Sequence, residues 1–105
     1  MKRGEVWNVV LDPTKGSEQK GFRTCVIVSP DSMNTALETV IVLPMTSSLK
    51  DWPTRVDTSF NDTEGQAQCE QIRTVSKKRL KSKLGNLSFE EVAKIKLTLK
   101  QMLFE

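Results

Sequence analysis

The last part of the chain, Leu87–Phe104, carries the strongest local pattern and limits what the rest can form. Ser88 is a favourable N-cap, and Glu91 three residues later completes a capping box. The apolar residues that follow recur at helical spacing on one face: Val92, Ile95, Leu99, Met102 and Leu103. We therefore expect one amphipathic helix at this end, packed on a sheet.

Upstream, proline, glycine and polar turns divide the sequence into short apolar stretches. Cys25–Val28 is apolar without interruption, which is typical of a central strand covered on both faces. We expect a short helix at Asp31–Leu37, a turn at Phe60–Gly65, and strands at Glu5–Leu11, Thr24–Ser29, Thr39–Met45, Thr54–Thr58, Gln66–Thr74 and Lys81–Gly85. Residues 1–105 are thus predicted to form one α+β domain, mainly β: a small barrel of mostly antiparallel strands with a C-terminal helix.

One of these strands has an irregular pattern. Side chains of a regular strand alternate between its two faces. Ala67 and Cys69 would therefore share one face and Ile72 would lie on the other, so a regular strand cannot bury all three on one side. A β-bulge near Glu70 and Gln71 would resolve the conflict, and bulges are frequent near active sites.

The composition excludes several kinds of site. The chain has no histidine, which excludes a histidine-based nuclease, a Ser-His-Asp triad and most zinc sites. The two cysteines, Cys25 and Cys69, lie in apolar or alternating stretches and are expected to be buried free thiols. We expect neither a metal nor a cofactor. Because histidine is absent, any acid–base chemistry must come from carboxylates, lysine or arginine.

The charge and the ends of the chain bear on partners and location. A net charge of +3 is compatible with an anionic partner. The densest positive patch is a solvated strand edge or, alternatively, a phosphate track, and consists of Lys77, Lys78, Arg79, Lys81 and Lys83. No apolar run approaches the ~20 residues of a membrane span, and Met1–Glu5 lacks the apolar core of a signal peptide. We expect a cytoplasmic protein.

Polar residues at three strand ends suggest a reactive site. Glu18 lies in a glycine-punctuated loop, Arg23 begins the next strand, and Thr46 ends the third. A carboxylate can take the proton of a ribose 2′-hydroxyl, while an arginine and a threonine hold the phosphoryl oxygens. A surface ion pair between Glu18 and Arg23, worth ~0–1 kcal/mol, explains the same residues. Composition and spacing alone therefore do not identify a nuclease.

Six sequence blocks change this balance: Arg3–Trp7, Leu11–Gln19, Gly21–Arg23, Val28–Pro30, Pro44–Ser47 and Glu70–Thr74. In their residues and their order, the blocks resemble the MazF/PemK toxins over essentially the whole chain. The resemblance implies an SH3-like barrel of the CcdB/MazF/PemK type, a homodimer, and metal-independent, sequence-specific cleavage of single-stranded messenger RNA. The products would carry a 2′,3′-cyclic phosphate and a 5′-hydroxyl. A cognate antitoxin with an acidic tail is implied as well.

The resemblance also assigns roles to individual residues. Glu18 matches the general base of the family, Arg23 its catalytic arginine and Thr46 its catalytic threonine. Because a guanidinium keeps its proton near neutral pH, we expect Arg23 to act as an electrostatic clamp. Contacts with RNA are expected from Lys15, Ser17, Gln19, Ser47, Trp52, Glu70 and Gln71.

One branch of the family uses a histidine, an arginine and an aspartate, and those positions hold Ser17, Gln68 and Glu70 here. That branch's mechanism cannot operate in this chain. Two alternatives to a ribonuclease stay open. A non-catalytic toxin of the same fold, resembling the gyrase poison CcdB, would act by protein binding, although the Trp-Gly-Ile ending of that family is replaced here by an amphipathic helix. A plain RNA-binding barrel would bind oligonucleotides and never cut them.

Overall fold

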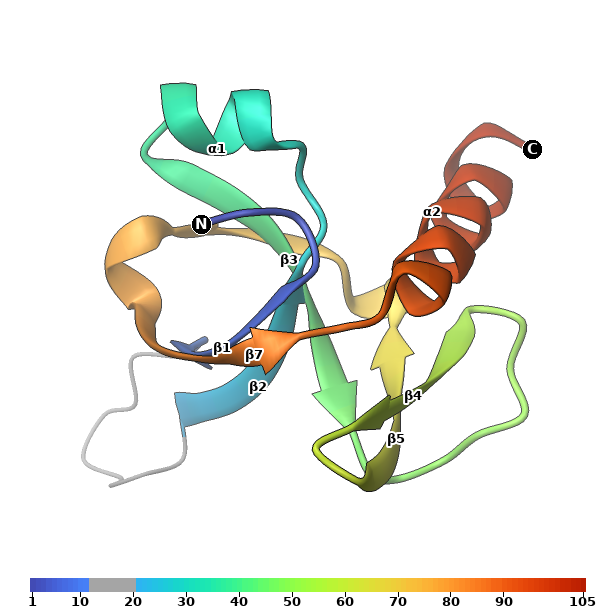
Figure 1. Cartoon of the computed structure of the whole chain (residues 1–105). Coiled ribbons are helices and arrows are strands. Elements are labelled where there is room, and N and C mark those ends of the chain that lie inside the picture. Colours follow the sequence, from blue (N-terminus) through green and yellow to red (C-terminus); the bar gives the residue numbers. More distant parts are fainter. Residues whose placement is uncertain (12–20) are drawn as a thin grey trace.

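The computed structural model describes residues 1–11 and 21–105 as a curled, antiparallel sheet with a C-terminal helix (Figure 1). Its elements are β1 (Glu5–Val10), β2 (Phe22–Ile27), α1 (Asp31–Ala36), β3 (Thr39–Thr46), β4 (Arg55–Phe60), β5 (Thr63–Gln68), β6 (Arg73–Ser76), β7 (Leu80–Asn86) and α2 (Phe89–Phe104). Single 3₁₀ turns, η2 (Cys69–Gln71) and η3 (Lys77–Arg79), precede β6 and β7. The mainly-β fold with a final helix confirms the prediction.

The long strand β3 joins the two parts of the sheet. The strands lie in the order β4-β5-β3-β2-β1-β7, and β6 also pairs with β3. The first half of β3 pairs with β6, its middle with β2, and its last two residues, Met45 and Thr46, with β5. The carboxyl end of β3 therefore lies where the sheet turns toward the β4–β5 hairpin, as Figure 1 shows.

The sheet has a hydrophobic cluster on each face. Cys25 and Ile27 belong to one cluster and Val26 to the other, which confirms that β2 is covered on both sides. Helix α2 packs on the Val26 side through Ile95, with further contacts from partly buried residues including Leu99. Leu103, expected on the buried stripe, is 54% exposed, because its neighbour Met102 is the residue of the last turn that packs against the cluster.

The predicted capping box is present at the start of α2. Glu91 N donates to Ser88 Oγ at 3.1 Å, and Ser88 N donates to Glu91 Oε1 at 2.8 Å. The second carboxylate oxygen of Glu91 accepts from Ser59 N at 2.7 Å. The same side chain thus caps the helix and fastens it to β4.

The bulge predicted near Glu70 and Gln71 is wrong. The Gln66–Thr74 segment is two strands, β5 and β6, joined by η2, in which Ile72 N donates to Cys69 O. A tight turn changes which face the following side chains point to, and a bulge does the same. The apolar pattern therefore could not distinguish the two. Register shifts occur instead where β1 pairs with β7, between Val6 and Trp7 and between Asn8 and Val9.

The β4–β5 connection is shorter than the predicted turn at Phe60–Gly65. Asn61 and Asp62 form a two-residue hairpin turn with φ of 51° and 60°, values that asparagine and aspartate tolerate well. Strands β4 and β7 lie at the two ends of the main strand order. Within residues 1–11 and 21–105, no helix is both long and apolar enough to cross a membrane.

Candidate active site

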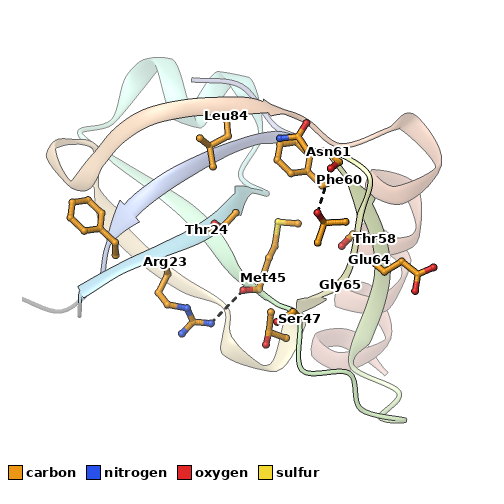
Figure 2. A pocket seen from close by; sticks show the side chains of 13 residues that line it. Arg23, Thr24, Met45, Ser47, Thr58, Phe60, Asn61, Glu64, Gly65 and Leu84 are labelled. Carbon is orange, nitrogen blue, oxygen red and sulfur yellow. Dashed lines mark hydrogen bonds between the residues drawn. The ribbon is translucent and has the colours of Figure 1, made fainter. Parts of the chain in front are cut away.

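The start of β2 and the end of β3 open onto a pocket of about 480 Å³ (Figure 2). Arg23 and Thr46, both predicted to be catalytic, line this pocket together with Ser47. They meet because β2 and β3 are antiparallel neighbours, with Cys25 paired to Pro44 just inside the opening. Two of the three predicted catalytic side chains therefore lie at one site.

Arg23 is exposed, and its contacts within the described residues are neutral. Its Nη2 atom donates to Gln68 Oε1 at 3.0 Å and makes a longer contact of 3.5 Å with Met45 O. These acceptors orient the guanidinium without cancelling its charge. An arginine held in this way is suited to bind an anionic oxygen.

The hydroxyl of Thr46 is prepared to donate a hydrogen bond. Its Oγ1 accepts from Ser48 N at 3.0 Å, which occupies one lone pair and leaves the hydroxyl hydrogen for another acceptor. Thr46 is the last residue of β3, and Ser47 after it is exposed. The strand end thus presents a donor beside the Arg23 guanidinium.

The remaining predicted loop residues, Lys15, Ser17, Glu18 and Gln19, lie outside the described residues. The residues that flank this segment are well anchored. Leu11 N donates to Gly21 O at 3.0 Å. Leu11 O accepts from Arg73 Nη2 at 3.2 Å and from Arg79 Nη1 at 3.0 Å. Part of the basic run therefore has a structural role, because Arg79 is bonded to the backbone.

Glu70, expected to contact RNA, has both carboxylate oxygens occupied. Arg55 Nε donates to Oε2 at 2.8 Å, and Thr54 Oγ1 donates to Oε1 at 2.9 Å. Burial raises the pKa of the Glu70 carboxyl, but the hydrogen bonds from Arg55, the backbone and Thr54 outweigh it, so the pKa is lowered overall. Its neighbour Gln71 is exposed. RNA contacts at both residues stay predictions.

Trp52 is half-exposed, at 49%, and stacks on the Arg55 guanidinium, whose carbon lies 4.5 Å from the ring centroid. Lys50 Nζ lies 5.8 Å from the same ring. These cation–π contacts hold the indole on the loop before β4. A base contact by Trp52 stays a prediction.

Sequence reasoning missed two glutamines that organise this region. Gln68 is the acceptor that orients Arg23. Gln66 is buried; its amide donates to Lys50 O and Asp57 Oδ1, and its carbonyl accepts from Lys50 N and Arg55 Nη1, at 3.0–3.2 Å. A buried glutamine with four hydrogen bonds fixes the loop after β3 to the sheet. Alternation gave no signal for Gln66, because it is next to the buried Ala67 and would by alternation face the other side of β5.

The cysteines are buried and unsuited to catalysis. Burial raises the pKa of Cys25 to about 12, against the opposing charges of Arg23 and Arg73, and raises that of Cys69 to about 11. Both are free thiols, as predicted. Within the described ranges, no three histidine, cysteine, aspartate or glutamate side chains gather to hold a metal ion.

Comparison with known proteins gives the chain a family. A family model described as PemK-like, MazF-like toxin of type II toxin–antitoxin system matches residues 2–103. The chain is 37% identical to endoribonuclease MazF9 of Mycobacterium tuberculosis, over 95% of this chain and 93% of that protein. It is 38% identical to endoribonuclease MazF of Staphylococcus saprophyticus, over 90% and 84%.

A solved structure agrees in fold. A mycobacterial endoribonuclease whose structure was solved in complex with its cognate antitoxin is 24% identical and superposes with a TM-score of 0.83, over 98% of this chain and 94% of the other. The sequence matches span nearly the full length of both curated relatives. The chain therefore belongs to the PemK/MazF family of type II toxin–antitoxin toxins.

Proposed function

We propose that this protein is the toxin of a type II toxin–antitoxin system and cleaves single-stranded RNA, chiefly messenger RNA, at specific sequences. The observation that carries the proposal is that Arg23 and the Thr46 hydroxyl line the same pocket. The contacts of Arg23 within the described residues are neutral. Relatives at 37% and 38% identity are named endoribonucleases, which favours this reading over a non-catalytic toxin or a plain RNA-binding barrel.

In the proposed reaction, Glu18 takes the proton of a ribose 2′-hydroxyl, and the resulting oxygen attacks the adjacent phosphorus. The O2′–P bond forms, the P–O5′ bond breaks, and the leaving 5′-oxygen takes up a proton from solvent. Negative charge grows on the non-bridging oxygens, where Arg23 and the Thr46 hydroxyl donate hydrogen bonds. The products are a 2′,3′-cyclic phosphate and a 5′-hydroxyl.

This mechanism needs the 2′-hydroxyl and uses only side chains of the protein, without a metal. A DNA strand of the same sequence should be spared because it lacks the attacking group. The test is incubation of the pure protein with a long RNA in excess chelator, followed by mapping of the 5′ ends. Cleavage at a short motif, blocked by a single 2′-deoxy substitution at the cut, supports the proposal.

Arg23→Ala should lower this cleavage strongly. Its matched control is Lys96→Ala, which removes an exposed cation from α2 and should leave cleavage unchanged. Loss of cleavage on addition of chelator, restored by a divalent metal, would contradict the side-chain mechanism. Binding of RNA with no cleavage under any condition would favour the RNA-binding alternative.

The proposal includes partners and location. We propose that the chain acts as a homodimer in the cytoplasm and is neutralised by an antitoxin whose acidic tail occupies the RNA site. The net charge of +3 and the exposed guanidinium of Arg23 suit an acidic segment. The mycobacterial relative with a similar fold has been solved with its antitoxin.

A further inference from the structure

The end of β1 is held by two arginine side chains from other parts of the sheet. Arg79, in η3, donates from Nη1 to Val10 O at 3.1 Å and to Leu11 O at 3.0 Å. Arg73, the first residue of β6, donates from Nη2 to the same Leu11 O at 3.2 Å. One backbone carbonyl thus accepts from two charged donors, which form stronger hydrogen bonds than neutral ones. We call Arg73 and Arg79 the anchoring arginines.

The side chain of Arg79 takes over where the pairing of β1 with β7 stops. Val9 is the last residue of β1 that pairs with β7, because β7 begins opposite it, at Leu80. The next two carbonyls, of Val10 and Leu11, have no partner strand on β7, and the ends of a ladder open most easily. Arg79 directly precedes β7 and donates to both carbonyls. A side chain thus continues the support that the backbone of β7 gives to the rest of β1.

The anchored end of β1 pairs with the part of β2 that carries Arg23. In the β1–β2 ladder Val9 lies opposite Arg23, and the pairing continues to the hydrogen bond from Leu11 N to Gly21 O at 3.0 Å. Arg23 therefore belongs to the last few residue pairs of the ladder, which the anchoring arginines hold from the side of β1. Opening of this end would move the Arg23 guanidinium away from the Thr46 hydroxyl.

Arg73 also connects this end of β1 to the strand that carries Thr46. On β6, Arg73 lies opposite Val42 of β3, and β3 ends at Thr46. Leu11 O is therefore a point at which the β1–β2 ladder and the β3–β6 ladder meet. The proposed reaction needs one group from each ladder at the same phosphate, and a misplacement of about 1 Å can cost roughly 100-fold in rate.

We propose that Arg73 and Arg79 are positioning residues for RNA cleavage: they hold the end of β1 and thereby keep Arg23 in place beside Thr46. The inference rests on the proposed function, which assigns Arg23 and Thr46 to the reacting phosphate. It also divides the basic run that includes Arg79. The guanidinium of Arg79 acts within the protein, whereas the side chain of its neighbour Lys78 is exposed.

The test compares Arg79→Met with the matched control Lys78→Met. Both remove one positive charge and keep an apolar stem, but only the first removes the two hydrogen bonds to β1. For Arg79→Met we expect kcat to fall about tenfold, with KM within about twofold of wild type, because RNA is still bound while Arg23 is misplaced. Lys78→Met should keep the wild-type kcat. Arg73→Met, which removes one hydrogen bond, should lose less than Arg79→Met.

A binding measurement separates positioning from direct contact with RNA. An oligonucleotide with 2′-deoxyribose at the cut binds without reacting, and its affinity is measured over a range of salt concentrations. Each phosphate of a single strand that a side chain neutralises contributes about 0.7 to the slope of log affinity against log salt. Arg79→Met should keep the wild-type slope. A slope that is smaller by about 0.7 would overturn the inference and make Arg79 a ligand of the RNA backbone.

Hydrogen exchange reports on the end of β1 without a cleavage assay. In Arg79→Met the Leu11 amide should exchange about tenfold faster than in wild type, whereas the Val28 amide, which donates to Ile41 O elsewhere in the sheet, should not change. Faster exchange with wild-type cleavage, or lost cleavage with wild-type exchange, would overturn the inference alone. A wild-type protein that cuts no RNA would remove the proposed function, and the inference would fall with it.

Discussion

Two arginines of this molecule, Arg23 and Arg55, both lie beside Gln68 at the end of β5 and have opposite surroundings. Arg55 is 6% exposed in its side chain, ion-paired to Glu70 at 2.8 Å, and stacked on Trp52. Arg23 is exposed, and its acceptors within the described residues are the neutral Gln68 and the Met45 carbonyl. The first guanidinium is used within the protein, whereas the second keeps its charge available for a substrate.

The largest effect is expected from Arg23→Ala. Removing a donor that meets transition-state charge costs roughly 10²–10³-fold in rate, so cleavage should fall by that factor. Stability should change by less than about 0.5 kcal/mol, because the side chain is exposed. Single-turnover cleavage and urea unfolding measure the two quantities. Full activity in this variant would remove Arg23 from the mechanism.

The counterpart is Arg55→Met, which keeps the apolar stem and removes the charged group. Glu70 would lose its ion pair and the Gln66 carbonyl one of its donors. We expect the free energy of unfolding to fall by about 1–3 kcal/mol. The comparison fails if Arg55→Met lowers cleavage as much as Arg23→Ala while leaving the urea midpoint unchanged.

A third variant, Gln68→Glu, converts the surroundings of Arg23 into those of Arg55. The new carboxylate can still accept from Nη2, so the guanidinium keeps its orientation, but its charge is neutralised. We expect kcat/KM to fall about tenfold, or ~1.4 kcal/mol. Gln68→Leu, which removes the acceptor and adds no charge, is the matched control and should have the smaller effect. Equal losses would mean that orientation matters more than charge.

The smallest effect is a pH dependence of stability. The pKa of Glu70 is lowered in the folded protein, so its contribution is present above the unfolded value of about 4.3 and is lost as pH falls through the folded pKa. Glu70→Gln should therefore lose less stability than wild type on acidification below about pH 5, by ~1 kcal/mol or less. Thermal unfolding between pH 7 and 3 measures the difference. The lowered pKa of Glu5 predicts that the variant keeps a residual slope.

The fold was largely predictable because its main signals are local. The capping box joins residues that are three apart in the sequence. The apolar run of β2 predicts a central strand because a strand covered on both faces has no polar side. The errors came where local rules are ambiguous. A 3₁₀ turn and a bulge both change the face to which the following side chains point, so the pattern at Glu70 and Gln71 fits either one.

The candidate site was predictable in part. Arg23 and Thr46 line one pocket, as their places at strand ends suggested, and their roles came from the family resemblance. Gln68 was noted only as the replacement for another branch's arginine, and its hydrogen bond with Arg23 was missed. The role of Gln68 depends on its position beside Arg23 in the folded sheet, which no local sequence pattern encodes.

By itself, then, the sequence determined the C-terminal helix, the central strands, the exclusion of histidine chemistry and the resemblance to a toxin family. Only the tertiary structure decided which charges are neutralised and which stay available. Arg23 meets Gln68 across 45 residues, and Arg55 meets Glu70 across 15. Such pairings depend on strand register, and no local pattern of side chains encodes which residues a register will bring together.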